Sequence, residues 1–277
     1  MIRLKNRFGK ANRKEMSWMS DLMETLRQEG ISPDLLRAVE EYRTAHALPE
    51  ALRPRIPASG FTYYGREVWE QALAALLCGE NLLLAGGKAT GKNVLAENLA
   101  AAFGRPAWDI SFHVNMDAAS LIGMDTFVDG AVTFRPGPVY RCAQCGGFGV
   151  LDEINMAKNE ALTSRFAVIQ MPTITEENLE KLLRAQFADL TDKYVHQFAL
   201  LFLDLQKKCD SAEISTKALD LRGMLDALRL MRRGVAAGPA LDMGITNKAF
   251  DSYEQGLIRD VIAARIPASL TAEKLFR

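Results

Sequence analysis

The fold is decided by one stretch in the first third of the chain, Asn81-Leu82-Leu83-Leu84-Ala85 followed by Gly86-Gly87-Lys88-Ala89-Thr90-Gly91-Lys92-Asn93. The apolar run, bounded by glycine, predicts a short buried strand. The next residues fit the pattern G-x-x-x-x-G-K and lead into a predicted helix over residues 93–103. Glycines let backbone N–H groups converge on phosphate oxygens, and the helix directs its positive N-terminus at the same anion. The stretch therefore predicts a phosphate-binding loop, in which Lys92 would reach the β- and γ-phosphates.

A second motif, Phe148-Gly149-Val150-Leu151-Asp152-Glu153, is a predicted strand that ends in two carboxylates. Open α/β sheets bind their ligands at the C-terminal edge of the strands, where these carboxylates would lie. Asp152 would hold Mg²⁺ through water, and Glu153 would orient and deprotonate an attacking water molecule. The last position of the glycine loop, usually a Ser or Thr whose hydroxyl binds Mg²⁺, is Asn93. Because an amide oxygen also binds hard cations, Asp152 and Asn93 are the predicted metal ligands.

The rest of the chain predicts alternating strands and helices, followed by a region that is helical throughout. Further strands are expected at residues 108–112 and 168–171, and a hairpin with Asp129-Gly130 at its turn. Helices are expected at residues 65–77, from Thr175 onward, and over residues 216–231 and 247–262. Alternating strands and helices are typical of an α/β fold with a parallel sheet.

The first sixty residues predict helices ahead of the α/β core. Apolar positions recur at helical spacing at Met16, Met19, Met23 and Leu26, and Ser32-Pro33 begins another helix. We therefore predict three parts: an N-terminal helical extension and linker over residues 1–60, an α/β core over 61–173, and an α-helical domain over 174–277.

Composition excludes several classes of protein. Of 277 residues 48% are hydrophobic, and 34 basic residues balance 34 acidic ones, so a disordered chain is excluded. No apolar run approaches the ~18–20 residues of a membrane span, and the basic start lacks the apolar stretch of a signal peptide. The chain has four cysteines, too few for a disulfide scaffold, and the C-x-x-C pair Cys142 and Cys145 lacks the second pair of ligands that a structural zinc needs. These features predict a cytoplasmic protein without a membrane or nucleic-acid partner.

Four further stretches resemble MoxR-type AAA+ ATPases, a family of P-loop proteins, over about residues 61–277. They are Tyr64-Gly65-Arg66-Glu67, Ser120-Leu121-Ile122-Gly123 with the hairpin after it, Phe134-Arg135-Pro136-Gly137-Pro138-Val139, and Asp152-Glu153-Ile154-Asn155-Met156-Ala157. The resemblance implies a parallel-sheet core with an α-helical lid domain, and ATP and Mg²⁺ as cofactors. It implies a nucleotide site formed by Tyr64, Gly65, Gly86, Gly87, Lys88, Ala89, Thr90, Gly91, Lys92, Asn93 and Val94.

The resemblance also implies two arginines that would act on the nucleotide. Leu162-Thr163-Ser164-Arg165-Phe166 is similar to the family's L-x-x-R-F segment, so Arg165 would be an arginine finger acting in trans on a neighbouring subunit's nucleotide. Arg222, early in the first long helix expected in the lid, matches the sensor-2 arginine. The competing interpretations are a surface arginine at a helix C-terminus for Arg165 and a solvated helix charge for Arg222.

The implied function is that of a chaperone-like remodeller. Family members form ring homo-oligomers, here expected as a hexamer, and act on a client protein, often with a partner that has a von Willebrand factor A domain. The hairpin at Asp129-Gly130 is the candidate substrate-facing element. Two alternatives stay open: a nucleotide-binding scaffold without turnover, and a motor subunit of a nucleic-acid enzyme. The second is suggested by six basic residues in the first fourteen: Arg3, Lys5, Arg7, Lys10, Arg13 and Lys14.

The interval between two of these motifs departs from the family. Asp152 and Arg165 are only thirteen residues apart, whereas the family has roughly fifty more residues, with a central strand that carries a polar sensor residue. The sequence has no such strand after residue 161, which would leave a gap in the sheet between the strands carrying Leu83 and Asp152. Unpaired backbone in a sheet interior is costly. We therefore expect that the molecule has residues here that this sequence does not include, with a true deletion as the alternative. If the strand is absent, we expect hydrolysis to be lost.

Overall fold

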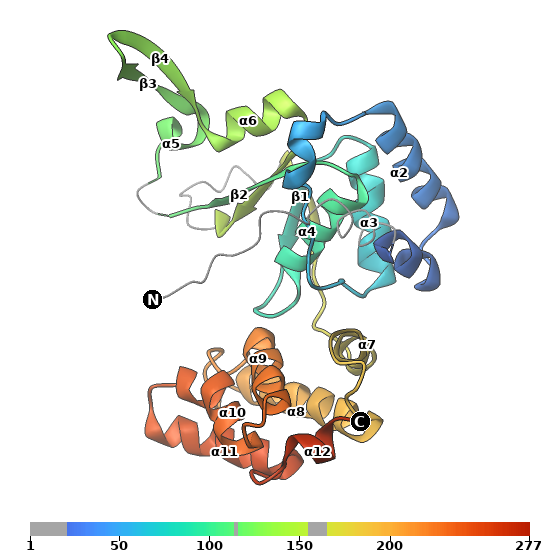
Figure 1. The fold of residues 1–277 in the computed structure, drawn as a ribbon, viewed down its shortest axis with the longest axis vertical. Coiled ribbons are helices and arrows are strands. Elements are labelled where there is room, and N and C mark those ends of the chain that lie inside the picture. Colours follow the sequence, from blue (N-terminus) through green and yellow to red (C-terminus); the bar gives the residue numbers. More distant parts are fainter. Residues whose placement is uncertain (1–20, 114–115, 155–164) are drawn as a thin grey trace. The chain divides into compact units, whose positions relative to one another are not determined.

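The computed structural model describes residues 21–113, 116–154 and 165–277. The chain forms two compact units (Figure 1). The first contains the chain up to Ala85 together with Gly91–Gln170, and the second contains Gly86–Thr90 together with Met171–Arg277. The basic residues of the first fourteen, together with Met16 and Met19, lie outside the described residues.

The first unit begins with helices that pack through apolar faces. Residues 21–28 are helical, and Met23 and Leu26 are buried as their spacing predicted. The other helices are α2 (Pro33–Ala45), the 3-10 helix η1 (Glu50–Arg55), α3 (Arg66–Leu77), α4 (Lys92–Ala102), α5 (Ala118–Ile122) and α6 (Pro138–Cys145). Ser32 holds the predicted N-cap position of α2, but its backbone N–H donates to Glu70 Oε1 at 2.9 Å and its side chain makes no cap hydrogen bond.

The strands of the first unit form three separate pairs. Two pairs are parallel, β1 (Leu82–Ala85) with β6 (Ala167–Gln170) and β2 (Ala107–Ser111) with β5 (Phe148–Asp152). The third pair is the antiparallel hairpin of β3 (Gly123–Val128) and β4 (Ala131–Pro136). Its turn residues Asp129 and Gly130 have φ angles of 52° and 82°, which confirms the predicted Asp-Gly turn.

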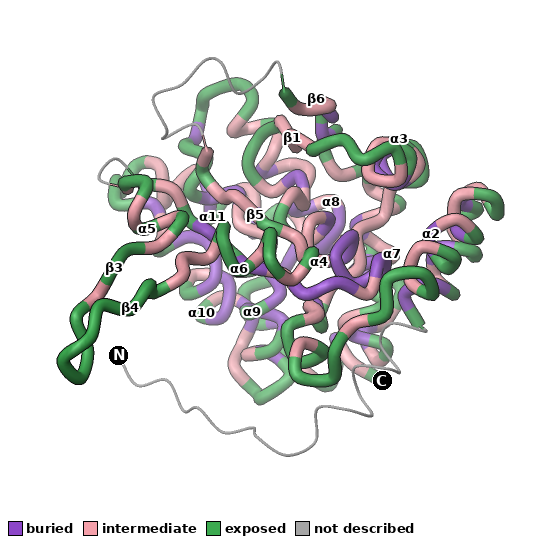
Figure 2. The backbone as a smooth tube through the Cα atoms, turned by 90° about the horizontal axis from the view of Figure 1, so that it is seen from above, coloured by how far each residue is buried: buried purple, intermediate pink, exposed green. Residues whose placement is uncertain are grey.

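The division of the parallel sheet falls where the short interval predicted a gap. Among the described residues, β1 pairs with β6 and β5 pairs with β2, but no ladder joins β1 to β5. A central strand of a parallel α/β sheet is buried on both faces. Here every residue of β1 is only half-buried, and β5 has no buried residue (Figure 2). The α/β class with parallel strands is confirmed, and the half-burial of β1 and β5 is what two strands without an inner neighbour would show.

The second unit is helical. Its elements are α7 (Glu176–Gln186), α8 (Asp192–Asp210), α9 (Leu221–Arg232), α10 (Ala237–Gly244), the 3-10 helix η4 (Thr246–Lys248), α11 (Ser252–Arg265) and α12 (Ala272–Leu275). Large side chains such as Phe198, Phe202 and Met224 are buried in its core. This confirms the helical C-terminal region expected from Thr175 onward. In the part of the chain that the structure describes, no helix is long and apolar enough to cross a membrane.

Two predicted helix starts in this unit are wrong. The helix expected from residue 216 begins at Leu221, because Asp220 is its N-cap and accepts a hydrogen bond from Gly223 N at 3.1 Å. The helix expected from residue 247 begins at Ser252, because Asp251 caps it through Glu254 N at 2.9 Å. The prediction for Thr175 is confirmed, since its hydroxyl accepts from Asn178 N.

A close crossing of α9 and α10 explains one glycine in the second unit. A Cβ atom at Gly223 would overlap the carbonyl oxygen of Gly244, so the two helices approach more closely than any other residue type would allow. Replacing Gly223 by Ala is expected to lower the free energy of unfolding by about 1–3 kcal/mol through overpacking. Chemical denaturation followed by circular dichroism measures this change.

Gly256 in α11 is the matched control for that substitution. A Cβ atom at Gly256 would have nothing within 4 Å. Gly256→Ala should therefore stabilise the protein by about 0.5–1 kcal/mol, because alanine has the better helix propensity. Equal effects of the two substitutions would contradict the assigned close crossing.

Candidate functional site

The glycine loop has the backbone conformation that its sequence requires. It leaves β1 at Gly86, which has a φ angle of 155°, and it reaches α4 through Gly91, the N-cap, whose φ is 84°. A Cβ atom at Gly91 would lie 2.9 Å from Cδ2 of Tyr63, so only glycine fits here without displacing that ring. Lys92 is the first residue of α4, and Asn93 and Val94 follow in its first turn. The loop thus places a helix N-terminus directly behind its glycines.

Two side chains of the loop segment in the second unit have defined partners. Lys88 Nζ donates to the carbonyl oxygen of Thr216 at 2.9 Å. Thr90 is buried, and its hydroxyl donates to the carbonyl oxygen of Gly87 at 3.1 Å. Ala89 between them has a φ of 62°, a left-handed conformation that alanine rarely adopts. Such strain persists only where the surroundings hold it, and it is concentrated at functional loops.

The two predicted metal ligands lie together in the first unit. Asn93 Nδ2 donates to Asp152 Oδ2 at 3.1 Å, although the two residues are 59 positions apart in the sequence. α4 supplies the amide and the end of β5 supplies the carboxylate. Turning the Asn93 amide over would present its oxygen beside the carboxylate. Amide and carboxylate oxygens are the ligands that Mg²⁺ prefers, so this pair fits the ion that the motifs predict.

Glu153 has a strained backbone next to this pair. Its φ is 55°, and its N–H donates to Asp152 Oδ1 at 2.9 Å. A non-glycine residue in this conformation costs about 1–3 kcal/mol. The Glu153 side chain is exposed, so its carboxylate can receive a proton from solvent or substrate. The strain lies at the residue that the sequence predicts as the general base.

The predicted residues ahead of α3 are held by a buried side chain that the sequence analysis missed. Tyr64 and Gly65 directly precede α3 and are half-buried. Asn98 of α4 is fully buried; it accepts from Tyr63 N at 2.8 Å and donates to Phe61 O at 2.9 Å. Burial raises the pKa of Tyr63 above its ordinary value. The signal in the sequence was a single polar residue among the apolar positions of α4.

The two predicted arginines are exposed and lie in different units. Arg165 belongs to the first unit and precedes β6, and Arg222 is the second residue of α9 in the second unit. The expectation that Arg222 lies in the first long helix of the lid is wrong, because the 19-residue helix α8 comes before α9. The remainder of the D-E-I-N-x-A run and Leu162-Thr163-Ser164 lie outside the described residues.

The cysteine pair Cys142 and Cys145 lies on α6, ahead of β5. Both thiols are free, and Cys142 Sγ donates to the carbonyl oxygen of Gly147 at 3.1 Å. Burial and the neighbouring Cys145 raise the pKa of Cys142 above its ordinary value. A raised thiol pKa lowers the thiolate fraction, which argues against a reactive redox pair.

This chain is similar to three curated proteins whose names assign no function. The uncharacterized protein YojN of Bacillus subtilis (strain 168) is 27% identical over 303 aligned residues, with 90% of this chain and 98% of the relative covered. The uncharacterized protein SH1500 of Staphylococcus haemolyticus is 26% identical, over 70% of this chain and 94% of the relative. The uncharacterized protein SAB1265c of Staphylococcus aureus is 25% identical with the same coverage.

These relatives have residues that this chain lacks inside the aligned region. Because 90% of 277 residues is about 249, the 303 positions aligned with YojN include about 54 at which this chain has no residue. The alignment with SH1500 gives the same difference, since 70% of the chain is about 194 residues and 248 positions are aligned. A difference of this size matches the segment that the sequence lacks after residue 161.

A family model matches the part of the chain that contains the glycine loop and Asp152. The AAA domain of the dynein-related subfamily matches residues 81–220, a range that begins at the strand before the glycine loop and ends at the N-cap of α9. The matched range is just over half of the chain. It includes the glycine loop and the strand that ends at Asp152. The chain therefore belongs to the AAA domain family, dynein-related subfamily, and carries the P-loop ATPase domain of that family.

Proposed function

We propose that this chain binds ATP with Mg²⁺ and hydrolyses it to remodel a partner protein, as a MoxR-type AAA protein. The observation that carries the proposal is the contact between Asn93 and Asp152. It joins the end of the glycine loop to the carboxyl end of a parallel strand. This is the edge at which α/β sheets bind their ligands.

Four residues of the first unit would each have a part in this reaction. Lys92 would pair with the β- and γ-phosphate oxygens as they enter the N-terminus of α4. Asp152 and Asn93 would hold Mg²⁺, which would supply positive charge against the phosphate groups. The carboxylate of Glu153 would orient the attacking water and accept its proton. Its exposure and its place beside Asp152 suit this role.

The completed site would need a second copy of the chain. Arg165 would reach the nucleotide of a neighbour in a ring, here proposed as a hexamer, and Arg222 would contact the γ-phosphate from the helical lid. An arginine supplied in trans stabilises transition-state charge and can raise hydrolysis rates by 10³–10⁵-fold. The exposure of both side chains supports these roles.

The hairpin β3–β4 is the proposed contact with the client protein. Its side chains Phe127 and Val132 are 75% and 69% exposed. Exposed apolar groups on an extended element are typical of a protein-binding surface. The client, with or without a partner that has a von Willebrand factor A domain, would be engaged there.

A second candidate function is a nucleotide-binding scaffold without turnover. The division between β1 and β5 among the described residues favours it, because in MoxR-type proteins a central strand carries the polar sensor residue. The replacement of the usual hydroxyl by Asn93 favours it too. Phosphate release by the purified chain, measured with and without Mg²⁺, separates the two candidates.

The substitution Asn93→Thr tests the magnesium site directly. In a hydrolysing protein, Asn93→Thr is expected to change Mg²⁺-dependent phosphate release by less than about tenfold, because one oxygen ligand replaces another. Asn93 is exposed, so the fold should tolerate the change. Asn81→Thr, at an exposed asparagine before β1, is the control and should leave the rate unchanged. Activity that appears only in Asn93→Thr would instead support the scaffold.

A further inference from the structure

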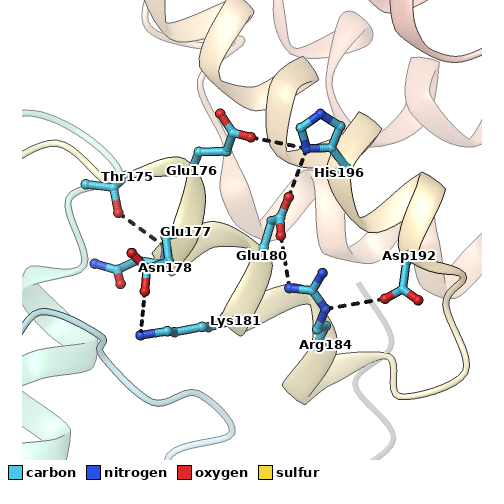
Figure 3. A network of polar contacts seen from close by, with 9 residues as sticks. All are labelled: Thr175, Glu176, Glu177, Asn178, Glu180, Lys181, Arg184, Asp192 and His196. Carbon is cyan, nitrogen blue, oxygen red and sulfur yellow. Dashed lines mark hydrogen bonds and ion pairs between the residues drawn. The ribbon is translucent and has the colours of Figure 1, made fainter. Parts of the chain in front are cut away.

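A cluster of three metal-ligating side chains joins two helices of the second unit (Figure 3). Glu176 and Glu180 lie four residues apart on α7 and so share one face of it. His196 projects from α8 between them, with Nδ1 3.1 Å from Glu176 Oε1 and 2.9 Å from Glu180 Oε1. One ligand atom from each residue lies within 4.8 Å of the others. None of the three belongs to the nucleotide site described above.

The helices hold these three side chains in place. α7 buries Leu179 and Leu183, and α8 buries Val195 and Phe198, so the backbone beneath the cluster is fixed by a packed core. Thr175 caps the N-terminus of α7 one residue before Glu176. Binding sites on packed helices keep their geometry better than sites on loops. The cluster is therefore organised before any ligand binds.

Both spacings from His196 Nδ1 to the glutamate oxygens are close to what a tetrahedral divalent cation needs. Zinc binds imidazole nitrogen at about 2.0–2.1 Å and carboxylate oxygen at about 2.0–2.2 Å, which places neighbouring ligand atoms roughly 3.3–3.5 Å apart. The two distances from His196 Nδ1, 3.1 and 2.9 Å, fall short of this by a few tenths of an ångström. A small outward rotation of the glutamates would make room for the ion. Three protein ligands would leave the fourth position to water.

A neighbouring arginine orients one of the ligands. Arg184 Nη1 donates to Glu180 Oε2 at 2.9 Å, which leaves Oε1 directed toward His196 (Figure 3). Hydrogen bonds of this kind, from outside the ligand set, fix a ligating carboxylate and sustain metal affinity.

We propose that Glu176, Glu180 and His196 form a binding site for one borderline divalent cation, with Zn²⁺ as its best-suited representative. Mixed nitrogen and oxygen ligands suit such cations, whereas Mg²⁺ and Ca²⁺ prefer oxygen alone. The ion would cross-link α7 to α8. Binding requires Nδ1 of His196 without its proton, so the neutral tautomer carries its hydrogen on Nε2 and any proton on Nδ1 is released to solvent.

Titration of the full chain with Zn²⁺ tests this site. The titration uses the background Cys142→Ser, Cys145→Ser and contains no nucleotide, because thiolates and the phosphate site could bind the same ion. We expect one ion per chain by calorimetry. The melting temperature should rise by about 5–10 °C at a Zn²⁺ concentration a hundredfold above Kd.

Substitutions in and around the cluster distinguish the metal ligands from residues that only lie near them. In the same background, His196→Ala and Glu180→Gln should each weaken Zn²⁺ binding by more than about a hundredfold, and Arg184→Met by about 10–100-fold. Glu177→Gln is the matched control, because Glu177 lies on the same helix but pairs with Lys181 at 3.1 Å. Circular dichroism checks that each variant is folded.

Three results would overturn the proposal. They are a wild-type protein that binds no Zn²⁺ in this background, a His196→Ala variant that binds as tightly as its parent, and a Glu177→Gln variant weakened as much as Glu180→Gln. Any of them would leave the cluster as a set of hydrogen bonds between His196 and two glutamates. The nucleotide site can fail its own tests without affecting this outcome, because no residue is shared between the two sites.

Discussion

Replacing Glu153 by Gln is expected to leave ATP binding intact while phosphate release falls by about 10²–10⁴-fold. The amide keeps the size and the hydrogen-bonding capacity of the side chain but cannot accept a proton from water. The strained backbone at this position, with φ of 55°, belongs to the main chain and should be retained. Binding is measured with a fluorescent ATP analogue and turnover by phosphate release, both with Mg²⁺ present.

The control for this substitution is Glu80→Gln. Glu80 is an exposed glutamate just before β1, in the same unit as Glu153, and should change neither binding nor turnover. Full activity in Glu153→Gln would remove Glu153 from the role of general base. A wild-type chain that binds ATP but releases no phosphate would support the scaffold function. In that case only the ATP affinities of the wild type and of Glu153→Gln could be compared.

Local signals in the sequence were sufficient for most elements of the fold. The apolar run after Asn81, the Asp129-Gly130 turn and the cap at Thr175 each specify their element within a few neighbouring residues, and all three are confirmed. The predicted starts of α9 and α11 lie several residues too early, because the helical spacing of apolar residues begins before the helix itself does. Asp220 and Asp251 decide those starts through single hydrogen bonds.

Contacts between distant parts of the chain could not be predicted in the same way. Arg105 is buried and donates to the carbonyl oxygens of His46, Cys145 and Gly146, which ties the end of α2 to the end of α6. Nothing in the sequence around Arg105 indicates partners some forty to sixty positions away. The same holds for Asn98 and Phe61 near the glycine loop. Such residues become visible only when tertiary packing brings their partners together.

The gap between β1 and β5 among the described residues could be predicted, because two sequence motifs fix the places of these strands in the sheet. The glycine loop and the Asp152 strand each specify a place in a parallel sheet, so the short interval after Asp152 already implied that one strand was missing. Two observations agree with this gap: β1 and β5 are only half-buried, and the alignments with two relatives contain about 54 positions at which this chain has no residue. The spacing of the two motifs indicates the gap, whereas the effect of the gap on hydrolysis depends on geometry that spacing does not contain.

The second large effect is expected from Lys92→Ala, which should weaken ATP binding by about 10–150-fold. Hydrogen bonds to charged groups contribute about 1.5–3 kcal/mol, and 1.4 kcal/mol corresponds to a factor of ten. Lys92 begins α4, directly after the Gly91 cap, so its charge adds to the positive end of that helix. Equilibrium binding of ATP, measured at one fixed salt concentration, gives the change.

Lys88→Ala provides the comparison, because it removes the same side chain from the same loop. Lys88 Nζ donates a hydrogen bond to the carbonyl oxygen of Thr216 in the second unit. Removing the Lys88 side chain would therefore mainly break that hydrogen bond and would cost few contacts with the phosphates. We expect less than about a fivefold loss of affinity, which is under 1 kcal/mol. Equal losses at both lysines would mean that the loop attracts ATP by general charge alone. A much larger loss at Lys92 requires a directed contact, since both substitutions remove one positive charge from the same loop.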